Sequence, residues 1–389
     1  MKKKLSLILI FCFLLVFSAA FTPDPQADEP PIFFDDFESY LTNTQLGAAY
    51  TVWEDGALMR VSIEKGYLIS GDQALRVDSI GVNQNTHTTS GSIYHLLQPG
   101  ENNWQEGIGM RLWIYNLSKS PLSFTVNFKE KYNEFWAVGD NGQFFLQTED
   151  GNFIQQDIQF GNLQIPAFYH GYVFIPFESF TVPTWNTAKG DEIMDLSAID
   201  SFSLGINVTV SELQRFIIDD IEVVSNSNIQ PPVITGNKII NIPESGQHQE
   251  YFQSSLPNEE NLSFVSKNWS IINADETIAS IDNDGWLTIP GDINPGVITI
   301  LNTTIADEVK INTLFDIQII DPGAALAITD DSQISEEILL IQEENSAYQK
   351  FSDDFETWAS ENRAWFVVIT ISLLLVLIAS LSIIQSRLK

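Results

Sequence analysis

The stretch FIIDDIEVV, Phe216–Val224, is the part of this sequence that decides the fold. Its β-branched and apolar residues predict a strand covered on both faces, and two adjacent carboxylates, Asp219 and Asp220, stand in its middle. Neighbouring side chains of a strand point to opposite faces, so at least one of these carboxylates faces the interior. A buried, unpaired carboxylate is costly, and we therefore expect a cation, an arginine or a cluster of donors beside it.

A second acidic segment lies near the start of the same region. In FFDDFESY, Phe33–Tyr40, the side chains of Asp36 and Glu38 share one face of a strand-like stretch. One acidic segment opens the region and the other closes it. This arrangement predicts a single domain whose ends meet around a metal ion.

Between these segments, short β-like runs alternate with turns rich in Gly, Asn and Asp. Ile199–Val208 has the clearest two-residue alternation, and similar runs occur at Met110–Tyr115 and Leu122–Phe128. Tyr172–Phe177 contains Pro176, which predicts that this strand ends there or lies at a sheet edge. About eight to ten such strands predict an antiparallel β-sandwich.

Both ends of the chain carry targeting signals. Residues 1–20 combine lysines, an apolar run and small residues, which predicts a secretory signal peptide. Residues 365–384 are uncharged and long enough to span a bilayer, and the basic tail 385–389 is then cytoplasmic. A buried core helix is the alternative for this stretch. We predict a single-pass protein of the cell membrane with its N-terminal part outside.

Changes in composition divide the remainder into segments. Residues 21–31 form a Pro- and acid-rich leader, and the polar stretch 225–232 predicts a linker between domains 32–224 and 233–322. Residues 323–364 are acidic and predict a stalk, with a partner-binding helix as the alternative. The predicted fold class is therefore all-β, with two sandwiches and one transmembrane helix.

Charge and missing motifs exclude several functions. The formal net charge of −32 makes nucleic acid and anionic lipid unfavourable partners. The single cysteine, Cys12, lies in the predicted signal peptide, so the mature chain has no disulfide. No zinc-protease, nucleophile-elbow, P-loop or Rossmann pattern occurs, and we predict no enzyme. A glycosidase with an unrecognised pair of carboxylates is the alternative.

Five segments in order resemble the jelly-roll, galactose-binding-like carbohydrate-binding modules of family 11: FDDFESY, SGDQALRV (Ser70–Val77), GYVFIPFESF (Gly171–Phe180), DLSAIDSFSLGINV and FIIDDIEVV. The resemblance covers residues 32–224. It implies a structural calcium ion that ties the terminal strands together. The matching candidate ligands are Asp36, Glu38, Asp72 and Asp220, with Asp219 as the alternate. Hydrogen bonding of these carboxylates to backbone amides, without calcium, is the alternative.

Sugar recognition in such folds uses aromatic rings on one sheet face. Trp113 and Tyr115 are the best pair, because alternation places them opposite the apolar face of their strand. The other candidates are Tyr132, Trp136, Trp53 and Trp104. Packing in the core is the alternative for each ring.

The segment Trp269–Thr288 resembles the bacterial Ig-like domains of surface adhesins, which implies a spacer or adhesion module. We therefore predict a membrane-anchored surface protein that binds a polysaccharide or cell-surface glycan without cleaving it. The alternative is an adhesive or structural protein whose sandwiches bind another protein and no sugar.

Overall fold

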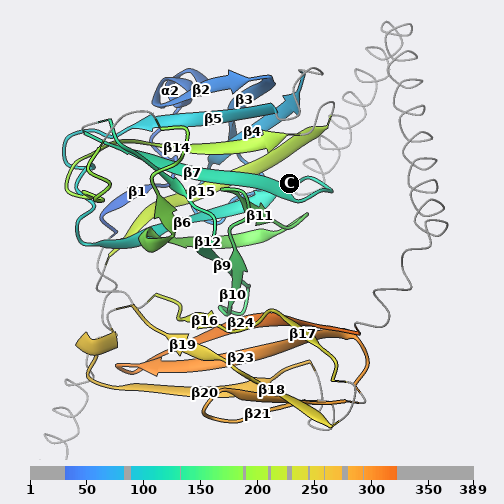
Figure 1. Cartoon of the computed structure of the whole chain (residues 1–389). Helices are drawn as coiled ribbons and strands as arrows, with labels where there is room; N and C mark the ends of the chain where they lie inside the picture. Colours follow the sequence, from blue (N-terminus) through green and yellow to red (C-terminus); the bar gives the residue numbers. More distant parts are fainter. Residues whose placement is uncertain are drawn as a thin grey trace, which may run out of the picture. The chain divides into compact units, whose positions relative to one another are not determined.

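Strands make up nearly all regular structure in the computed structural model of this chain (Figure 1). The structure describes residues 31–321 except 83–88, 132, 187–189, 209–211, 226–229, 244–245, 258, 274–278 and 292. The predicted signal peptide, stalk, transmembrane helix and tail, and Tyr132, lie outside the described residues. In the described part of the chain, no helix is long and apolar enough to cross a membrane.

The first sandwich contains a seven-stranded sheet in the order β13-β8-β7-β14-β5-β2, with β11 beside β7. Its strands are β2 (Tyr50–Asp55), β5 (Thr89–Leu96), β7 (Leu122–Glu130), β8 (Phe135–Val138), β11 (Leu163–Ile165), β13 (Phe180–Thr181) and β14 (Ile199–Val208). The predicted strand Ile199–Val208 is confirmed at both ends. Phe202 and Leu204 are buried in the core, so alternation turns Ser203 and Gly205 to the outer face.

The opposing sheet follows the order β10-β9-β12-β6-β15-β4-β3, with β1 beside β15. Its strands are β1 (Phe33–Asp35), β3 (Ala57–Glu64), β4 (Ala74–Gly81), β6 (Gly107–Asn116), β9 (Gln143–Gln147), β10 (Phe153–Asp157), β12 (His170–Pro176) and β15 (Leu213–Ser225). The short helices α2 (Asn43–Ala49) and η1 (Phe177–Ser179) complete this sandwich. Strand β12 ends at Pro176 as predicted, but it pairs with β6 and β9 and is no edge strand.

A β-bulge interrupts β15 at the two carboxylates of FIIDDIEVV. Along β6, Asp219 pairs with Trp113 and Glu222 pairs with Arg111, so β15 contains one extra residue between these pairs. Asp220 has a φ of +46°, which is left-handed backbone. The simple alternation expected along this strand therefore fails at Asp220.

The bulge keeps apolar residues in the core on both sides of it. Ile218 before the bulge and Ile221 and Val223 after it all lie in the main core, although their spacing breaks strict alternation. The extra residue, Asp220, is left on the outer face beside Asp219. On its other edge, β15 pairs with β4 before the bulge and with β1 after it.

A second hydrophobic core lies in the C-terminal part of the described chain and includes Phe252, Trp269 and Phe315. The elements around it are β16 (Val233–Thr235), β17 (Ile239–Asn241), β18 (Gln247–Tyr251), β19 (Gln253–Ser255), η2 (Glu259–Asn261), β20 (Val265–Ile271), β21 (Ser280–Ile281), β22 (Trp286–Pro290), β23 (Gly296–Ala306) and β24 (Val309–Ile320). Trp269, the first residue of the segment that resembles Ig-like domains, lies in this core. We call this region the second sandwich.

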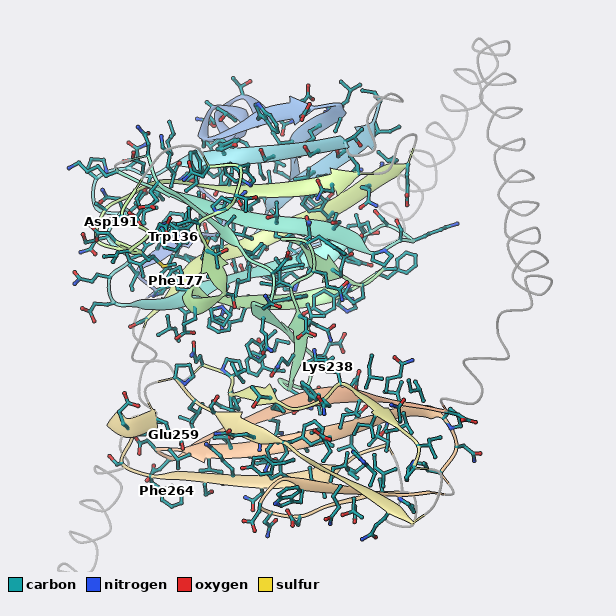
Figure 2. The ribbon with its side chains drawn as sticks, viewed as in Figure 1. Trp136, Phe177, Asp191, Lys238, Glu259 and Phe264 are labelled. Carbon is teal, nitrogen blue, oxygen red and sulfur yellow. The ribbon has the colours of Figure 1, made fainter. Side chains whose placement is uncertain are left out.

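The hairpin β9–β10 joins the two sandwiches. Strand β10 pairs in parallel with β24, so the sheet of the first sandwich continues into β24, β23 and β20 and has twelve strands, β17 included. The side-chain amide of Gln155 donates to Ile234 O and accepts from Ile234 N. Lys238 Nζ lies 2.6 Å from Asp157 Oδ2 (Figure 2). Both cores belong to one compact unit that ends at Ile319.

Candidate functional site

Small polar residues cover the middle of the outer face of the seven-stranded sheet. Cross-strand pairing forms one row of Ser92, Gly205 and Thr125 and a second row of Tyr94, Ser203 and Asn127. A Cβ at Gly205 would lie only 2.7 Å from Thr125 Cγ2, so this position has no room for a side chain. The middle of the face therefore stays low between the larger side chains around it.

A hollow of about 540 Å³ lies on this face. Its base consists of Thr125, Asn127, Ala137 and Asn207 from β7, β8 and β14. Its walls are the segments 138–140, which begins at the end of β8, 160–162, which lies after β10, and 181–185, which begins at the end of β13. Strand pairing therefore supplies the base, and connections that are distant in sequence supply the walls.

Two large aromatic side chains in the wall of the hollow are exposed to solvent. Phe160 is 90% exposed and Trp185 is 59% exposed. Trp185 contacts Phe135 edge-on, with ring centroids 5.5 Å apart and planes at 61°, which fixes one side of the indole. Exposed rings that border a concave site are candidates for ligand contact, because they present free apolar faces beside polar groups.

Polar contacts hold the wall 160–162 against the base. Asn207 Nδ2 donates to Asn162 Oδ1 at 2.7 Å, and Asn162 Nδ2 donates to Phe160 O at 2.6 Å. The backbone N–H of Gly161 donates to Asp140 Oδ1 at 2.8 Å. These bonds fix the backbone that carries the Phe160 ring, so the site is organised before a ligand arrives.

The chemistry of the hollow is uncharged apart from one carboxylate. None of the described residues that line it is Lys or Arg, and Asp140 is its one acidic residue. Amide, hydroxyl and ring groups can bind hydroxyls and C–H faces, whereas glycoside hydrolysis normally uses two carboxyl groups. The lining is therefore equipped for binding and lacks a carboxylate pair.

Two of the predicted ligand-binding tryptophans lie in the core instead. Trp104 is fully buried, its indole stacks on Phe177 with centroids 6.1 Å apart, and its Nε1 donates to Glu101 O at 2.9 Å. Trp136, on β8, is also buried in the main core (Figure 2). Both rings fill space between the sheets, so neither presents a free face to a ligand.

The pair predicted as the best platform lies on the outer face of the twelve-stranded sheet. Trp113 and Tyr115 share that face, but Trp113 is only 6% exposed because it packs with Ala74, Ile217 and the overlying Leu68. Tyr115 is partly buried. The prediction of an open platform is therefore wrong for Trp113, because the loop before β4 covers it. Alternation along a strand does not reveal such a loop.

Trp53 remains a candidate and lies on the same face as the hollow. It is 51% exposed and pairs across the strands with Ser92 of the low row. Two strands, β5 and β2, lie beyond β14 in this direction, so Trp53 marks the far side of the face from the hollow. Tyr132 lies outside the described residues.

The two acidic segments do meet, and donors surround their carboxylates. Glu38 Oε1 accepts from the backbone N–H groups of Asp72 and Gln73 at 2.6 and 2.8 Å. Asp220 accepts from Ser70 Oγ and from Tyr172 OH, both at 2.8 Å. These contacts join the segment after β1 and the bulge in β15 to the loop before β4, and Tyr172 joins the bulge to β12.

The side chains of Asp36 and Asp219 also accept from backbone amides, and Asp72 takes part through its own backbone N–H. Asp36 Oδ1 accepts from Glu38 N at 3.1 Å, and Asp219 Oδ2 accepts from Ile69 N at 3.2 Å. Burial raises the pKa of Asp219 to about 6. In the described part of the chain, no group of three or more acidic or histidine side chains is placed to hold a metal ion. The observed donors account for the carboxylates of Asp36, Glu38, Asp219 and Asp220, and calcium stays a prediction.

The sequence analysis missed Phe160 and Trp185. Both stand in connections without alternation: Phe160 precedes Gly161-Asn162, and Trp185 ends the run Thr181–Trp185, which contains Pro183. A large ring inside a turn-forming segment, where no strand pattern buries it, is the signal that indicates exposure. The sequence does not show that these two connections meet.

Comparison with solved structures finds β-sandwich modules that bind carbohydrate. The family 11 carbohydrate-binding module of a cellulosomal cellulase from Clostridium thermocellum is 16% identical, with 49% of this chain and 92% of the module covered and a TM-score of 0.33. A family 22 module from a C. thermocellum enzyme is 13% identical, with 53% and 100% covered and a TM-score of 0.26.

A β-1,2-glucanase from Parabacteroides distasonis is 8% identical, with 70% of this chain and 37% of the enzyme covered and a TM-score of 0.27. The sequence matches no protein-family model and no curated protein. At such low identities and TM-scores, the function has to be inferred from the residues of this chain.

Proposed function

We propose that the first sandwich binds a neutral polysaccharide, without cleaving it, through the hollow on the outer face of its seven-stranded sheet. The observation that carries this proposal is the pair of exposed rings, Phe160 and Trp185, beside a base of amides and hydroxyls. Sugar rings present apolar C–H faces and a rim of hydroxyls, so one ligand uses both features at once.

Electrostatics supports a neutral ligand rather than an acidic one. A uronate or sulfate would need a cation in the site, and the described lining has none. The chain as a whole has a formal charge of −32, which repels anionic polymers over a longer range. Neutral glucans, xylans and galactans are therefore the appropriate test ligands.

In this proposal the protein works at the cell surface. The predicted signal peptide and the predicted C-terminal span support export and anchoring, with the sandwiches outside the cell. Polymer binding at such a site would hold the cell to its substrate or to its wall.

The experiment is native gel retardation of the full chain in polysaccharide-containing gels. We expect the wild type to be retarded by at least one neutral polymer and by no anionic one. The double change Phe160→Ala with Trp185→Ala should weaken retardation by about tenfold or more, because two stacking rings are lost. Phe168→Ala is the matched control, because Phe168 is also exposed and also has positive φ, 57° against 52° for Phe160.

Three results would contradict the proposal. A folded wild type that no neutral polymer retards would favour a protein ligand for the same rings. Equal retardation of the wild type and the double variant would move the binding site elsewhere on the chain. New reducing ends in the bound polymer would show cleavage and make the protein an enzyme.

A further inference from the structure

The second sandwich carries its own exposed pair of rings. Tyr251 on β18 and Trp286 on β22 pair directly across the strands, with centroids 5.1 Å apart and planes at 45°. Both side chains are 46% exposed. The pair lies outside the second core and has no part in the hollow of the first sandwich.

A tight turn fixes the position of Trp286. Asp282 N donates to Trp286 O at 3.1 Å, and Trp286 N donates to Asp282 Oδ1 at 2.9 Å. Gly285 has a φ of +93°, and a Cβ there would lie 2.2 Å from Phe252 O, so only glycine fits. Phe252 follows Tyr251, and its N–H donates to Gly285 O at 2.9 Å. This bond fixes the backbone beside Tyr251 against the backbone beside Trp286.

The same sheet face continues from the rings with uncharged polar groups. Strand pairing places Gln249 opposite Thr288 and Gln247 opposite Pro290, and Ser280 of β21 pairs with Thr288. Gln249 Nε2 donates to Thr288 Oγ1 at 3.3 Å. Among the described residues of these three strands, none on this face is charged. We call this surface the Tyr251–Trp286 face.

The strand positions of this face carry no charge, although the chain has 51 acidic residues and Asp282 and Asp284 lie in the turn before Trp286. Two rigid rings followed by amides and hydroxyls repeat the chemistry of the hollow: stacking surface at one end, hydroxyl-binding groups along the rest. A basic protein partner would be drawn to the acidic surfaces instead of this neutral one. The chemistry that fits the face is again a neutral sugar chain.

We propose that the Tyr251–Trp286 face is a second contact site for neutral polysaccharide. This inference rests on the proposed function of the first sandwich and adds a separate site to it. Two weak sites on one chain bind a long polymer more tightly than either site alone, because the second contact forms at a high effective concentration. The second sandwich would then be a binding module in its own right.

The test uses the full chain, with the polymer that retards the wild type most strongly. In the background Phe160→Ala with Trp185→Ala, we expect weak residual retardation, which Tyr251→Ala with Trp286→Ala removes. In the wild-type background, Tyr251→Ala with Trp286→Ala should lower affinity for the long polymer about five- to tenfold and leave a tetrasaccharide unaffected. Phe264→Ala is the matched control, because Phe264 is an exposed ring elsewhere on the second sandwich (Figure 2).

The outcomes separate failure of the Tyr251–Trp286 face from failure of the hollow. If Tyr251→Ala with Trp286→Ala changes neither background while its thermal unfolding matches the wild type, the second site is rejected and the first stands. If that double variant loses as much affinity as Phe264→Ala and no more, the second site is likewise rejected. If no neutral polymer retards the wild type, both proposals fail together. Should the double alanine variant unfold, Tyr251→Ser with Trp286→Gln keeps polar bulk on the face and replaces it in the same comparison.

Discussion

The two outer faces of the first sandwich differ in what covers them. On the twelve-stranded sheet, Leu68 of the loop before β4 lies over Trp113 and Ile217, and Asp219 holds that loop through Ile69 N. On the seven-stranded sheet, the connections stand around a low floor and enclose a hollow. Both faces carry aromatic residues on alternating strand positions, so the covering loop decides which rings a ligand can reach.

The first face is closed by carboxylates and the second is left open by small residues. The carboxylates of Glu38, Asp219 and Asp220 accept hydrogen bonds from amides and a hydroxyl of this loop, which fixes the loop in place. Ser203 and Gly205 on the other sheet leave room above them because they are small. The covered face therefore contributes to stability, and the open face is the one to which we assign binding in the proposed function.

The two faces should differ most in the unfolding free energy that is lost when one ring is removed from each. Trp113→Ala should lower the free energy of unfolding by about 3–5 kcal/mol, because it leaves a cavity beneath the covering loop. Trp185→Ala should change it by less than about 0.5 kcal/mol, because its ring is exposed. Urea denaturation measures both. Equal losses of unfolding free energy would show that the covering loop does not distinguish the two faces.

Two changes at the bulge separate its backbone from its carboxylate. Asp220→Ala removes the bonds from Ser70 and Tyr172 and leaves a side chain at positive φ, at a cost of about 2–3 kcal/mol in unfolding free energy. Asp220→Gly removes the same bonds but accepts positive φ, and should cost about 1 kcal/mol less. If the two variants are equally stable by urea denaturation, the backbone conformation contributes nothing.

The core shared by both faces has its own pH dependence. His95 packs 4.7 Å from the Tyr50 ring, and burial lowers its pKa below the ordinary 6.5. The folded state therefore binds fewer protons than the unfolded state, and stability falls as the pH drops through 6.5 toward the folded pKa. In the His95→Phe variant, the midpoint of unfolding should change less with pH between about pH 7 and pH 5.5 than in the wild type. An unchanged slope in that variant would assign the effect to other groups.

The smallest expected effect concerns the far side of the open face. Trp53→Ala should weaken binding of a long neutral polymer by about two- to threefold and leave a tetrasaccharide unaffected, because Trp53 lies two strands beyond the hollow. Affinity gels with the polymer, and calorimetry with the tetrasaccharide, measure the two values. A loss as large as that of Trp185→Ala would move the centre of the site toward β2.

Strands whose partners bury one face could be predicted from the sequence. Ile199–Val208 matches β14 and Leu122–Phe128 lies within β7, because their alternation reflects a real division between core and surface. The meeting of the two acidic segments also follows from the sequence. The bulge does not, because it depends on which strand of the sheet ends beside Asp219.

The binding site could be predicted only in part. Trp53 and Trp104 both stand in polar stretches of the sequence, yet Trp53 is exposed and Trp104 is buried. Trp136 is also buried, so a polar local sequence does not separate exposed rings from core rings. Phe160 and Trp185 belong to separate connections, and only the order of β8, β7 and β14 brings them to one hollow. Contacts between distant connections depend on strand order, which local patterns do not contain.

The position of β1 beside the end of β15 has a consequence for synthesis. Ile69 and Asp219, which contact each other at the bulge, are separated by 150 residues, and β1 precedes both. While the chain is being made, the backbone of β1 has no partner strand until β15, the last strand of the sandwich, emerges. Such distant pairing slows folding, because the entropy of closing a long loop is lost before the contacts that repay it have formed.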